Sequence, residues 1–193
     1  MECINFGAYA GPPDVRLRFG GQSFGVHRSI LASRSDYFKA MFTGGFMESH
    51  QTEITIHETS VRLFEKLLAS VYDSTEISRL PLRTADDVSA AFRLCVLADK
   101  YLLTALKARV IEKIITVFAS ADDEGREQRL TSTLSLFAKH LDETTLSPYY
   151  DRIANLIPRQ HIAFDALLCP EHELCEAHPN LVMKITQVYL INL

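Results

Sequence analysis

The segment from Val15 to Val26 restricts the fold more than any other part of the sequence. Three apolar residues alternate with two arginines over residues 15–19, Gly20 and Gly21 follow, and the apolar pattern resumes at residues 24–26. Alternation with a period of two is typical of a half-buried strand, and a Gly-Gly pair between two such strands predicts a tight hairpin turn. We therefore expect two antiparallel strands whose shared apolar face must be covered by other elements.

The pattern changes to helical spacing directly after this hairpin. Apolar residues at helical intervals within residues 30–42 predict a short helix and then a second helix, with Ser35 as the N-cap of the second. Gly44–Gly45 is expected to end that second helix. Alternation over residues 53–57 predicts a third strand, which should join the sheet of the hairpin.

Helices dominate the remaining sequence. Thr59 or Ser60 is placed to cap a helix whose apolar face comes from residues 61–71, and residues 73–83 form a connector. Asp86 or Asp87 is expected to start the next helix. Further helical patterns cover residues 101–118, 130–141, 146–156, 160–168 and 181–190. The predicted fold class is therefore α+β, with a small three-stranded sheet covered by a cluster of helices and followed by an all-helical extension.

Composition and charge exclude several classes of function. The 193 residues carry 20 lysines and arginines against 24 aspartates and glutamates, and the basic residues do not gather into a stripe. Direct binding of nucleic acid, which needs a concentrated positive surface, is not expected. No apolar run reaches the roughly 18 residues of a membrane span, and residues 1–13 lack the pattern of a signal peptide. We expect a cytoplasmic or nuclear protein that does not bind membranes.

Two common catalytic motifs are missing from the sequence. It contains no His-Glu-x-x-His motif and no phosphate-binding loop. Cys95 lies within the helical pattern of residues 92–97, so we interpret it as a buried, reduced thiol. Neither enzymatic activity nor a cofactor is predicted.

One spacing of cysteine and histidine is typical of metal sites. Cys169, His172, Cys175 and His178 follow one another at intervals of three residues, and thiolate with imidazole suits tetrahedral zinc. On one straight helix the first and last would lie about 13 Å apart, too far for a single ion. We therefore favour an exposed short helix without metal, and a zinc site formed around an intervening turn is the alternative hypothesis.

Several short stretches together resemble one protein family. The stretches are Asp14-Val15-x-Leu17, Phe24-Gly25-Val26-His27-Arg28-Ser29-Ile30-Leu31-Ala32, Ser35-x-Tyr37-Phe38-Lys39-Ala40-Met41-Phe42, Gly45-Phe46-Met47-Glu48-Ser49 and Ala98-Asp99-Lys100-Tyr101. They resemble the BTB/POZ family over roughly residues 14–113, and residues 96–107 are most similar to BTB proteins of fungal type. The resemblance implies an N-terminal segment at 1–13, a BTB/POZ domain at 14–119, and a helical extension of the 3-box or BACK type at 120–193.

The resemblance also implies a function in binding other proteins. In family members that act as adaptors of cullin-based ubiquitin ligases, a hydrophobic-x-acidic element contacts the cullin, and Phe46, Met47 and Glu48 match it. Another interpretation places Phe46 in the core and leaves Glu48 solvated. The alternative function is a self-associating scaffold or transcriptional-regulator domain without a ligase.

A charged pair is the second element that the family implies. Asp14 and Arg28 match a pair that lines a groove in family members. A structural interpretation of Asp14 and His27 is hydrogen bonding that fixes the corner between strand and helix. The favoured partners are proteins, including a cullin or a second copy of the chain.

Overall fold

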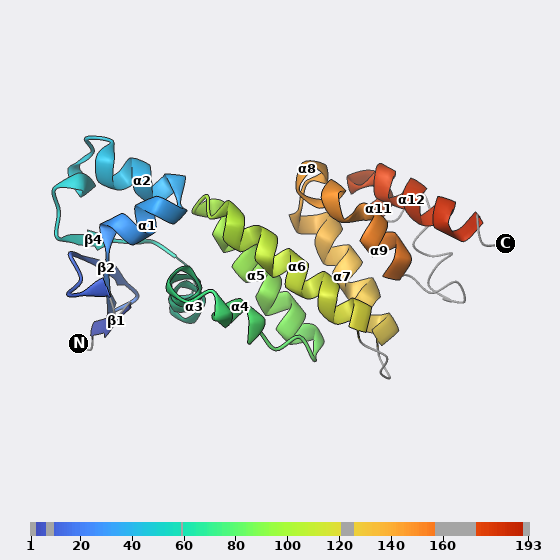
Figure 1. Ribbon diagram of the computed structural model, residues 1–193, viewed down its shortest axis with the longest axis horizontal. Coiled ribbons are helices and arrows are strands. Elements are labelled where there is room, and N and C mark those ends of the chain that lie inside the picture. The colour runs from blue at the N-terminus through green and yellow to red at the C-terminus, as the bar shows by residue number, and fades with distance from the viewer. Residues whose placement is uncertain (1–2, 7–9, 59, 121–125, 157–172, 191–193) are drawn as a thin grey trace. The chain divides into compact units, whose positions relative to one another are not determined.

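The computed structural model describes residues 3–6, 10–58, 60–120, 126–156 and 173–190 (Figure 1). They fall into two compact units, one within residues 1–80 and 93–111 and the other within residues 81–92 and 112–193. Two long helices, α5 (Ala85–Lys100) and α6 (Thr104–Ser120), have residues in both units.

A small sheet forms one side of the first unit. Its strands are β1 (Cys3–Asn5), β2 (Val15–Phe19), β3 (Gln22–Val26) and β4 (Glu53–Thr55), in the order β1-β3-β2-β4. Strands β2 and β3 are antiparallel, whereas β1 and β4 run parallel to their neighbours. The predicted hairpin and third strand are confirmed, and β1 is a fourth strand that three residues were too few to reveal by alternation.

The hairpin turn depends on its two glycines. Gly20 and Gly21 have φ angles of 53° and 81°, the pair of left-handed conformations that a two-residue hairpin turn of type I′ requires. A Cβ atom on Gly20 would lie 2.6 Å from Val61 Cγ2. The turn therefore needs glycine for its backbone conformation at both positions and also for space at the first.

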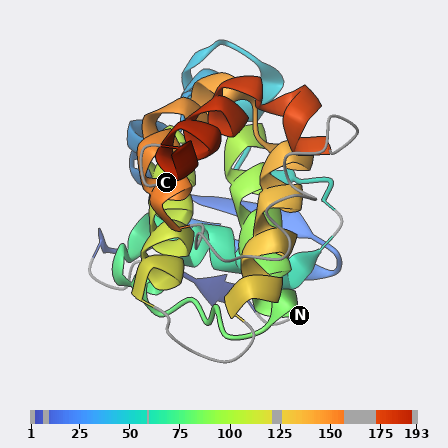
Figure 2. The same ribbon diagram turned by 90° about the vertical axis from the view of Figure 1, so that its right-hand side faces the viewer.

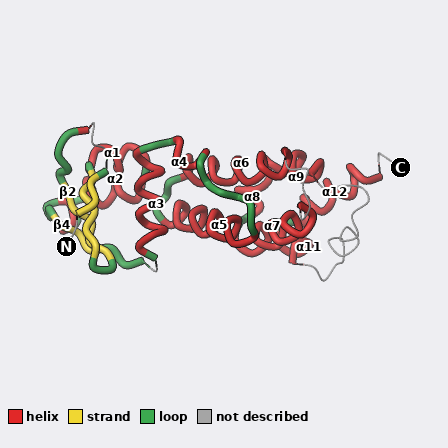
Figure 3. The backbone as a smooth tube through the Cα atoms, turned by 90° about the horizontal axis from the view of Figure 1, so that it is seen from below, coloured by secondary structure: helices red, strands yellow, loops and turns green. Residues whose placement is uncertain are grey.

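Two of the three helices beside the sheet begin at serine caps. Helices α1 (Arg28–Arg34), α2 (Asp36–Thr43) and α3 (Val61–Tyr72) lie beside the strands, as Figure 3 shows. The Ser35 hydroxyl accepts a hydrogen bond from the Phe38 amide, and the Ser60 hydroxyl accepts one from Leu63. The predicted caps of α2 and α3 are therefore confirmed, and α2 ends at Gly44 as expected.

Aromatic rings fill the space between the sheet and these helices. Tyr101 stacks on Phe38 with ring centroids 5.3 Å apart, and Phe64 lies 5.7 Å from Tyr101 and 5.9 Å from Phe24. This packing joins strand β3 to helices α2 and α3. Among the apolar residues at the junction of β3 with α1 and α2, Ile30 and Met41 are half-buried, while five others are buried. The buried ones are Phe24, Val26, Leu31, Phe38 and Phe42.

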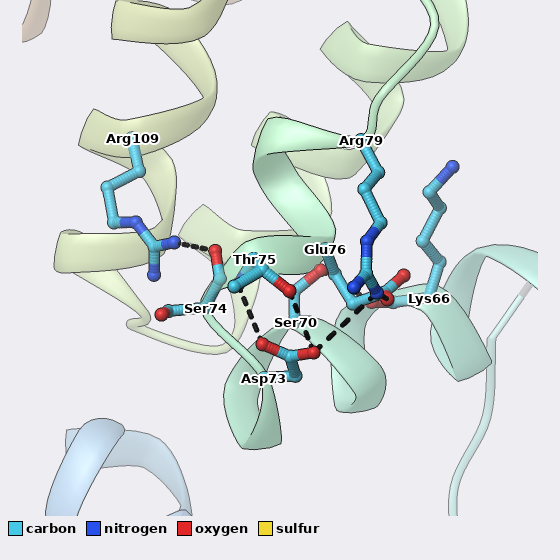
Figure 4. A network of polar contacts seen from close by, with 8 residues as sticks. All are labelled: Lys66, Ser70, Asp73, Ser74, Thr75, Glu76, Arg79 and Arg109. Carbon is cyan, nitrogen blue, oxygen red and sulfur yellow. Dashed lines mark hydrogen bonds and ion pairs between the residues drawn. The ribbon is translucent and has the colours of Figure 1, made fainter.

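The predicted connector after α3 contains a short helix, α4 (Thr75–Ser78). Figure 4 shows its polar network, in which the Asp73 carboxylate accepts hydrogen bonds of 2.8 Å from the amide and the hydroxyl of Thr75. These bonds favour the ionised form and lower the pKa of Asp73. Arg79 pairs with Glu76 at 2.7 Å, and the Arg109 guanidinium donates to the Ser74 carbonyl. The connector is thus held to α6 by a side-chain contact.

Helix α5 begins at Ala85, one residue before the predicted start. The Asp87 carboxylate accepts from the amides of Arg83 and Thr84 at 3.1 and 3.0 Å, and the Thr84 hydroxyl accepts from the Asp87 amide at 3.2 Å. This reciprocal arrangement is a capping box. The hydrogen bonds that its carboxylate accepts from Thr84 and Arg83 lower the pKa of Asp87.

The described part of the second unit is helical. It contains α7 (Arg126–His140), α8 (Glu143–Leu146), the 3₁₀ turn η3 (Ser147–Tyr149), α9 (Tyr150–Leu156), α11 (Glu173–Ala177) and α12 (Pro179–Leu190). Helix α12 packs against α9 and α11 against α7 (Figure 2). The helix predicted over residues 160–168 lies outside the described residues. Within those that are described, no helix is long and apolar enough to cross a membrane.

Candidate protein-binding surface

A fixed turn follows helix α2 and presents Phe46 and Met47. The Gly44 amide closes the helix by donating to the Ala40 carbonyl at 2.8 Å, and Gly45, with φ of 74°, reverses the chain. The 3₁₀ turn η2 (Met47–Ser49) comes next. Its start is fixed because the Phe46 carbonyl accepts from both the amide and the hydroxyl of Ser49, at 3.0 and 2.5 Å.

Both apolar side chains of this turn face solvent. Phe46 is 58% exposed and Met47 is 77% exposed, while Glu48 is half-buried. The Phe46 ring lies against Gly44, where a Cβ atom would approach the ring to 2.8 Å. Phe46 is therefore outside the core, contrary to the interpretation that made it a core residue. Adjacent exposed apolar side chains beside a carboxylate are suited to protein binding.

Two further exposed apolar residues lie at the other end of α2. Tyr37 is 37% exposed and Leu102 is 50% exposed. They are close because the Tyr37 ring contacts the Tyr101 ring at 5.1 Å, and the Ser35 hydroxyl donates to the Tyr101 carbonyl at 2.6 Å. Eight helical residues span about 12 Å, so α2 separates this pair from the Phe46 turn by roughly that length.

The exposure of Tyr37 and Leu102 is not evident from the sequence. Tyr37 falls within the helical apolar pattern of α2, next to the buried Phe38, and this pattern alone does not distinguish an exposed residue from a buried one. Leu102 has φ of 51°, a conformation for which the sequence offers no glycine signal. An apolar residue placed directly after the end of a long helix was the one available hint.

The side chains of Asp14 and Arg28 have different hydrogen-bond partners. The Asp14 carboxylate accepts a hydrogen bond of 2.9 Å from the Arg28 amide, at the N-terminus of α1. The Arg28 guanidinium instead donates to the carbonyls of Ser49, at 2.9 Å, and Gln51, and lies 5.0 Å from the centre of the Phe42 ring. Arg28 therefore belongs to the same site as the Phe46 turn.

His27 fixes the corner between β3 and α1. Its Nδ1 lies 3.1 Å from the Tyr72 hydroxyl, its Nε2 lies 3.1 Å from the Gly11 carbonyl, and its amide donates to the Tyr72 hydroxyl at 2.7 Å. A neutral ring with its proton on Nε2 satisfies all three contacts. Burial raises the pKa of Tyr72, which keeps the phenol available as a donor to Nδ1.

The four residues of the zinc hypothesis are only partly described. Cys169 and His172 lie outside the described residues, whereas Cys175 is half-buried on α11. His178 is fully buried, with Nδ1 3.2 Å from the Tyr150 hydroxyl and Nε2 3.3 Å from the Phe137 carbonyl. Among described residues, no group of three or more His, Cys, Asp or Glu could hold a metal ion.

Comparison with known proteins finds one family. The family model for the BTB/POZ domain matches residues 10–117. Kelch-like protein 26 of Danio rerio is 42% identical over 78 residues, which are 40% of this chain and 13% of that protein. TD and POZ domain-containing protein 1 of Mus musculus is 28% identical over 177 residues, covering 90% of this chain and 43% of that protein.

A third relative comes from another animal group. BTB and MATH domain-containing protein 15 of Caenorhabditis elegans is 33% identical over 126 residues, or 54% of this chain and 46% of that protein. The chain thus spans less than half the length of each of these three relatives.

Proposed function

The chain belongs to the BTB/POZ domain family, and from that premise we propose that it is an adaptor of a cullin-based ubiquitin ligase. As a BTB domain it is a protein-interaction module. Phe46, Met47 and Glu48 are proposed as the centre of the cullin-binding surface, and a cytoplasmic or nuclear location follows from this role. The proposed domain limits are residues 14–119 for the BTB/POZ domain and 120–193 for the extension.

The exposure of Phe46 and Met47 on a hydrogen-bonded turn is the observation that carries this proposal. Large apolar side chains on a fixed backbone lose little conformational entropy when a partner covers them, so most of the buried area contributes to affinity. The neighbouring Glu48 carboxylate supplies orientation, because a misplaced charge would be costly in the interface.

Tyr37 and Leu102 extend the proposed surface along helix α2. Their exposed faces lie about 12 Å from the Phe46 turn, a length that two turns of a partner helix would cover. Tyrosine is among the residues enriched at the centres of interfaces. We therefore expect a helical segment of the cullin to lie along α2 and to contact both ends.

The test measures binding of the whole chain to the N-terminal region of a purified cullin by calorimetry. Exchanging both Phe46 and Glu48 for alanine should weaken binding by about 30-fold or more, since the loss of a single hot-spot residue costs about 2 kcal/mol or more. The melting temperature should stay close to that of the wild type, because Phe46 is outside the core. Met183→Ala, which removes an exposed methionine from α12, is the matched control.

The wild type and the double variant are compared only if their melting temperatures show that both are folded. If the folded double variant binds the cullin as tightly as the wild type, the proposed surface is wrong. If the wild type itself does not bind any cullin tested, the adaptor function is wrong, whatever the variant does.

A second candidate function is a self-associating scaffold or transcriptional-regulator domain. The 77% exposure of Met47 favours it as well, because an apolar patch of this kind can also pair with its own copy across a twofold axis. Light scattering over a range of concentrations separates the candidates. Growth of the particle mass that Phe46→Ala abolishes would support the scaffold, and a constant monomer mass would exclude it.

A further inference from the structure

We infer that Arg28 is a positioning residue, which holds the Phe46–Glu48 turn in its exposed conformation from the neighbouring helix α1. Its guanidinium contacts backbone carbonyls of the chain itself, whereas a residue that lines a groove would direct its charge toward a bound ligand. The inference deepens the proposed function, because it names what fixes the geometry of the proposed surface, and only its binding measurement rests on that function.

The Arg28 guanidinium is directed at the backbone that follows Phe46. One terminal nitrogen donates to the Ser49 carbonyl at 2.9 Å and lies 3.5 Å from the Glu48 carbonyl, and the other donates to the Gln51 carbonyl. These carbonyls are 20 to 23 residues away in the sequence. A single side chain therefore gathers three carbonyls of one turn and connects them to α1.

The shape of the guanidinium explains why arginine serves here. Its planar fork carries five N–H donors with fixed directions, so it can meet several carbonyls at once, whereas a lysine ammonium is a point charge on a flexible stem. The guanidinium also lies over the Phe42 ring, 5.0 Å from its centre, which fixes the plane of the fork. Phe42 is in the last turn of α2, two residues before Gly44 and four before Phe46.

Asp14 contacts the backbone of Arg28 and acts as a cap of α1. Its carboxylate accepts the hydrogen bond of the Arg28 amide at 2.9 Å, and its own amide donates to the Val26 carbonyl at 3.2 Å. A carboxylate at the first amide of a helix acts as a cap and is favoured by the helix dipole. Asp14 thus fixes the backbone of Arg28 at the corner of β2, β3 and α1, and the side chain of Arg28 carries the connection on to the turn.

Two variants distinguish this positioning role from the alternative in which Asp14 and Arg28 line a charged groove. Arg28→Lys keeps the positive charge and loses the fork, so the turn should open. Asp14→Asn removes the negative charge and keeps an oxygen that caps a helix about as well as aspartate does. A charged groove predicts that Asp14→Asn impairs partner binding, whereas the positioning role predicts that it does not.

The experiment follows hydrogen exchange of backbone amides in the whole chain without any partner. The amides of Ser49, His50 and Gln51 donate within the turn at 3.0, 3.2 and 3.3 Å. In Arg28→Lys we expect them to exchange about tenfold faster than in the wild type, since one hydrogen bond to a charged group contributes about this factor or more. Core amides of β2 and β3 serve as the internal reference. A general loss of stability would raise their exchange rates as well, so the rates of the turn amides are compared with theirs in each protein. Arg34→Lys, an equivalent exchange in the last turn of the same helix, should change neither set.

Binding of the cullin region is then measured for the same proteins. Arg28→Lys should weaken it about tenfold, and Asp14→Asn and Arg34→Lys should leave it unchanged. Unchanged exchange of the turn amides in Arg28→Lys would overturn the inference, and so would a loss of binding in Asp14→Asn equal to that in Arg28→Lys. If the wild type binds no cullin, the proposed function fails, while the exchange measurement still decides the role of Arg28.

Discussion

The hydroxyl of Tyr101 donates a hydrogen bond of 2.5 Å to the carboxylate of Glu58, whose side chain is only 6% exposed. The same carboxylate pairs with the Lys100 ammonium at 2.7 Å. A buried carboxylate is costly unless it has hydrogen-bonding and charged partners, and these two contacts supply Glu58 with one of each. They connect the segment after β4 to the end of α5, where Tyr101 also stacks on Phe38.

Tyr101→Phe should lower the free energy of unfolding by about 1–3 kcal/mol, because it leaves a buried charged acceptor with one partner fewer. Urea unfolding followed by circular dichroism measures the change. Tyr37→Phe removes a hydroxyl from a 37% exposed tyrosine that packs on the same ring, and should cost less than about 0.5 kcal/mol. Equal losses in the two variants would contradict the assignment of the effect to Glu58.

Leu102 provides a prediction about backbone conformation. It has φ of 51° and is the second residue after the end of α5. Its amide donates to the Asp99 carbonyl at 2.9 Å, and the Leu103 amide donates to the Ala98 carbonyl at 2.8 Å. This is a Schellman motif with leucine at the position where glycine is usual. Because alanine at this position keeps the left-handed strain and glycine does not, the Leu102→Gly protein should be more stable than the Leu102→Ala protein by about 1 kcal/mol.

The control for this prediction lies in the interior of the same helix. Ala90 is exposed and has a helical conformation, in which alanine is more favourable than glycine. Ala90→Gly should therefore lower the free energy of unfolding by about 1 kcal/mol. Thermal unfolding of the wild type and the three variants gives both differences. If Leu102→Ala proved more stable than Leu102→Gly, the backbone at this position would not be left-handed in solution.

The parts of the fold that the sequence predicted correctly depend on local chemistry. The Gly20–Gly21 turn, the caps at Ser35 and Ser60, and the stop at Gly44 all depend on residues within four positions of one another. Their conformations are therefore encoded in short stretches that can be read without knowing the tertiary structure. The alternation of β2 similarly predicted which of its side chains are buried.

The exposure and the contacts of the proposed binding surface could not be predicted in this way. The exposure of Phe46 depends on what packs around the turn, and three residues carry no periodicity that separates a buried turn from an exposed one. The contacts of the Arg28 guanidinium join residues 20 to 23 positions apart, so no local pattern contains them. The resemblance to the BTB/POZ family named both Arg28 and Phe46, yet it did not indicate that one supports the other.

Cys95 should be unreactive in the folded protein. It is fully buried, and this burial raises the pKa of its thiol from 9.0 to about 12, because the thiolate would lose its hydration. The protonated thiol is favoured in the folded state, so this contribution to stability is complete below pH 9.0 and is lost as the pH rises toward about 12.

Iodoacetamide labelling at mildly alkaline pH, with the modified peptides identified by mass, tests this prediction. In native buffer Cys95 should be labelled no faster than the protein unfolds, and in urea it should be labelled within minutes. Native labelling much faster than the exchange of the slowest core amides would contradict the burial of the thiol. Cys95→Ala controls for labelling elsewhere in the peptide.

His178 should act as a structural residue of the second unit. Its two ring nitrogens contact the Tyr150 hydroxyl and the Phe137 carbonyl, and burial together with the charge of Glu143 raises the pKa of Tyr150 to about 12. His178→Ala would leave a cavity, and the Tyr150 hydroxyl and the Phe137 carbonyl would each lose one hydrogen-bond partner, so it should lower the free energy of unfolding by about 2–5 kcal/mol. His140→Ala, at an exposed position in the last turn of α7, should cost less than about 1 kcal/mol.

Added zinc distinguishes this role from that of a metal ligand. Because both ring nitrogens of His178 already have hydrogen-bond partners, a metal ion would have to displace Tyr150 or Phe137 before it could bind there. We therefore expect one equivalent of zinc to leave the melting temperature of the wild type unchanged, in protein purified without an affinity tag. A rise in the wild type that is absent in His178→Ala would instead support zinc binding by His178 with Cys175 and the cysteine and histidine that precede them, since a ligand that binds only the folded state raises its stability.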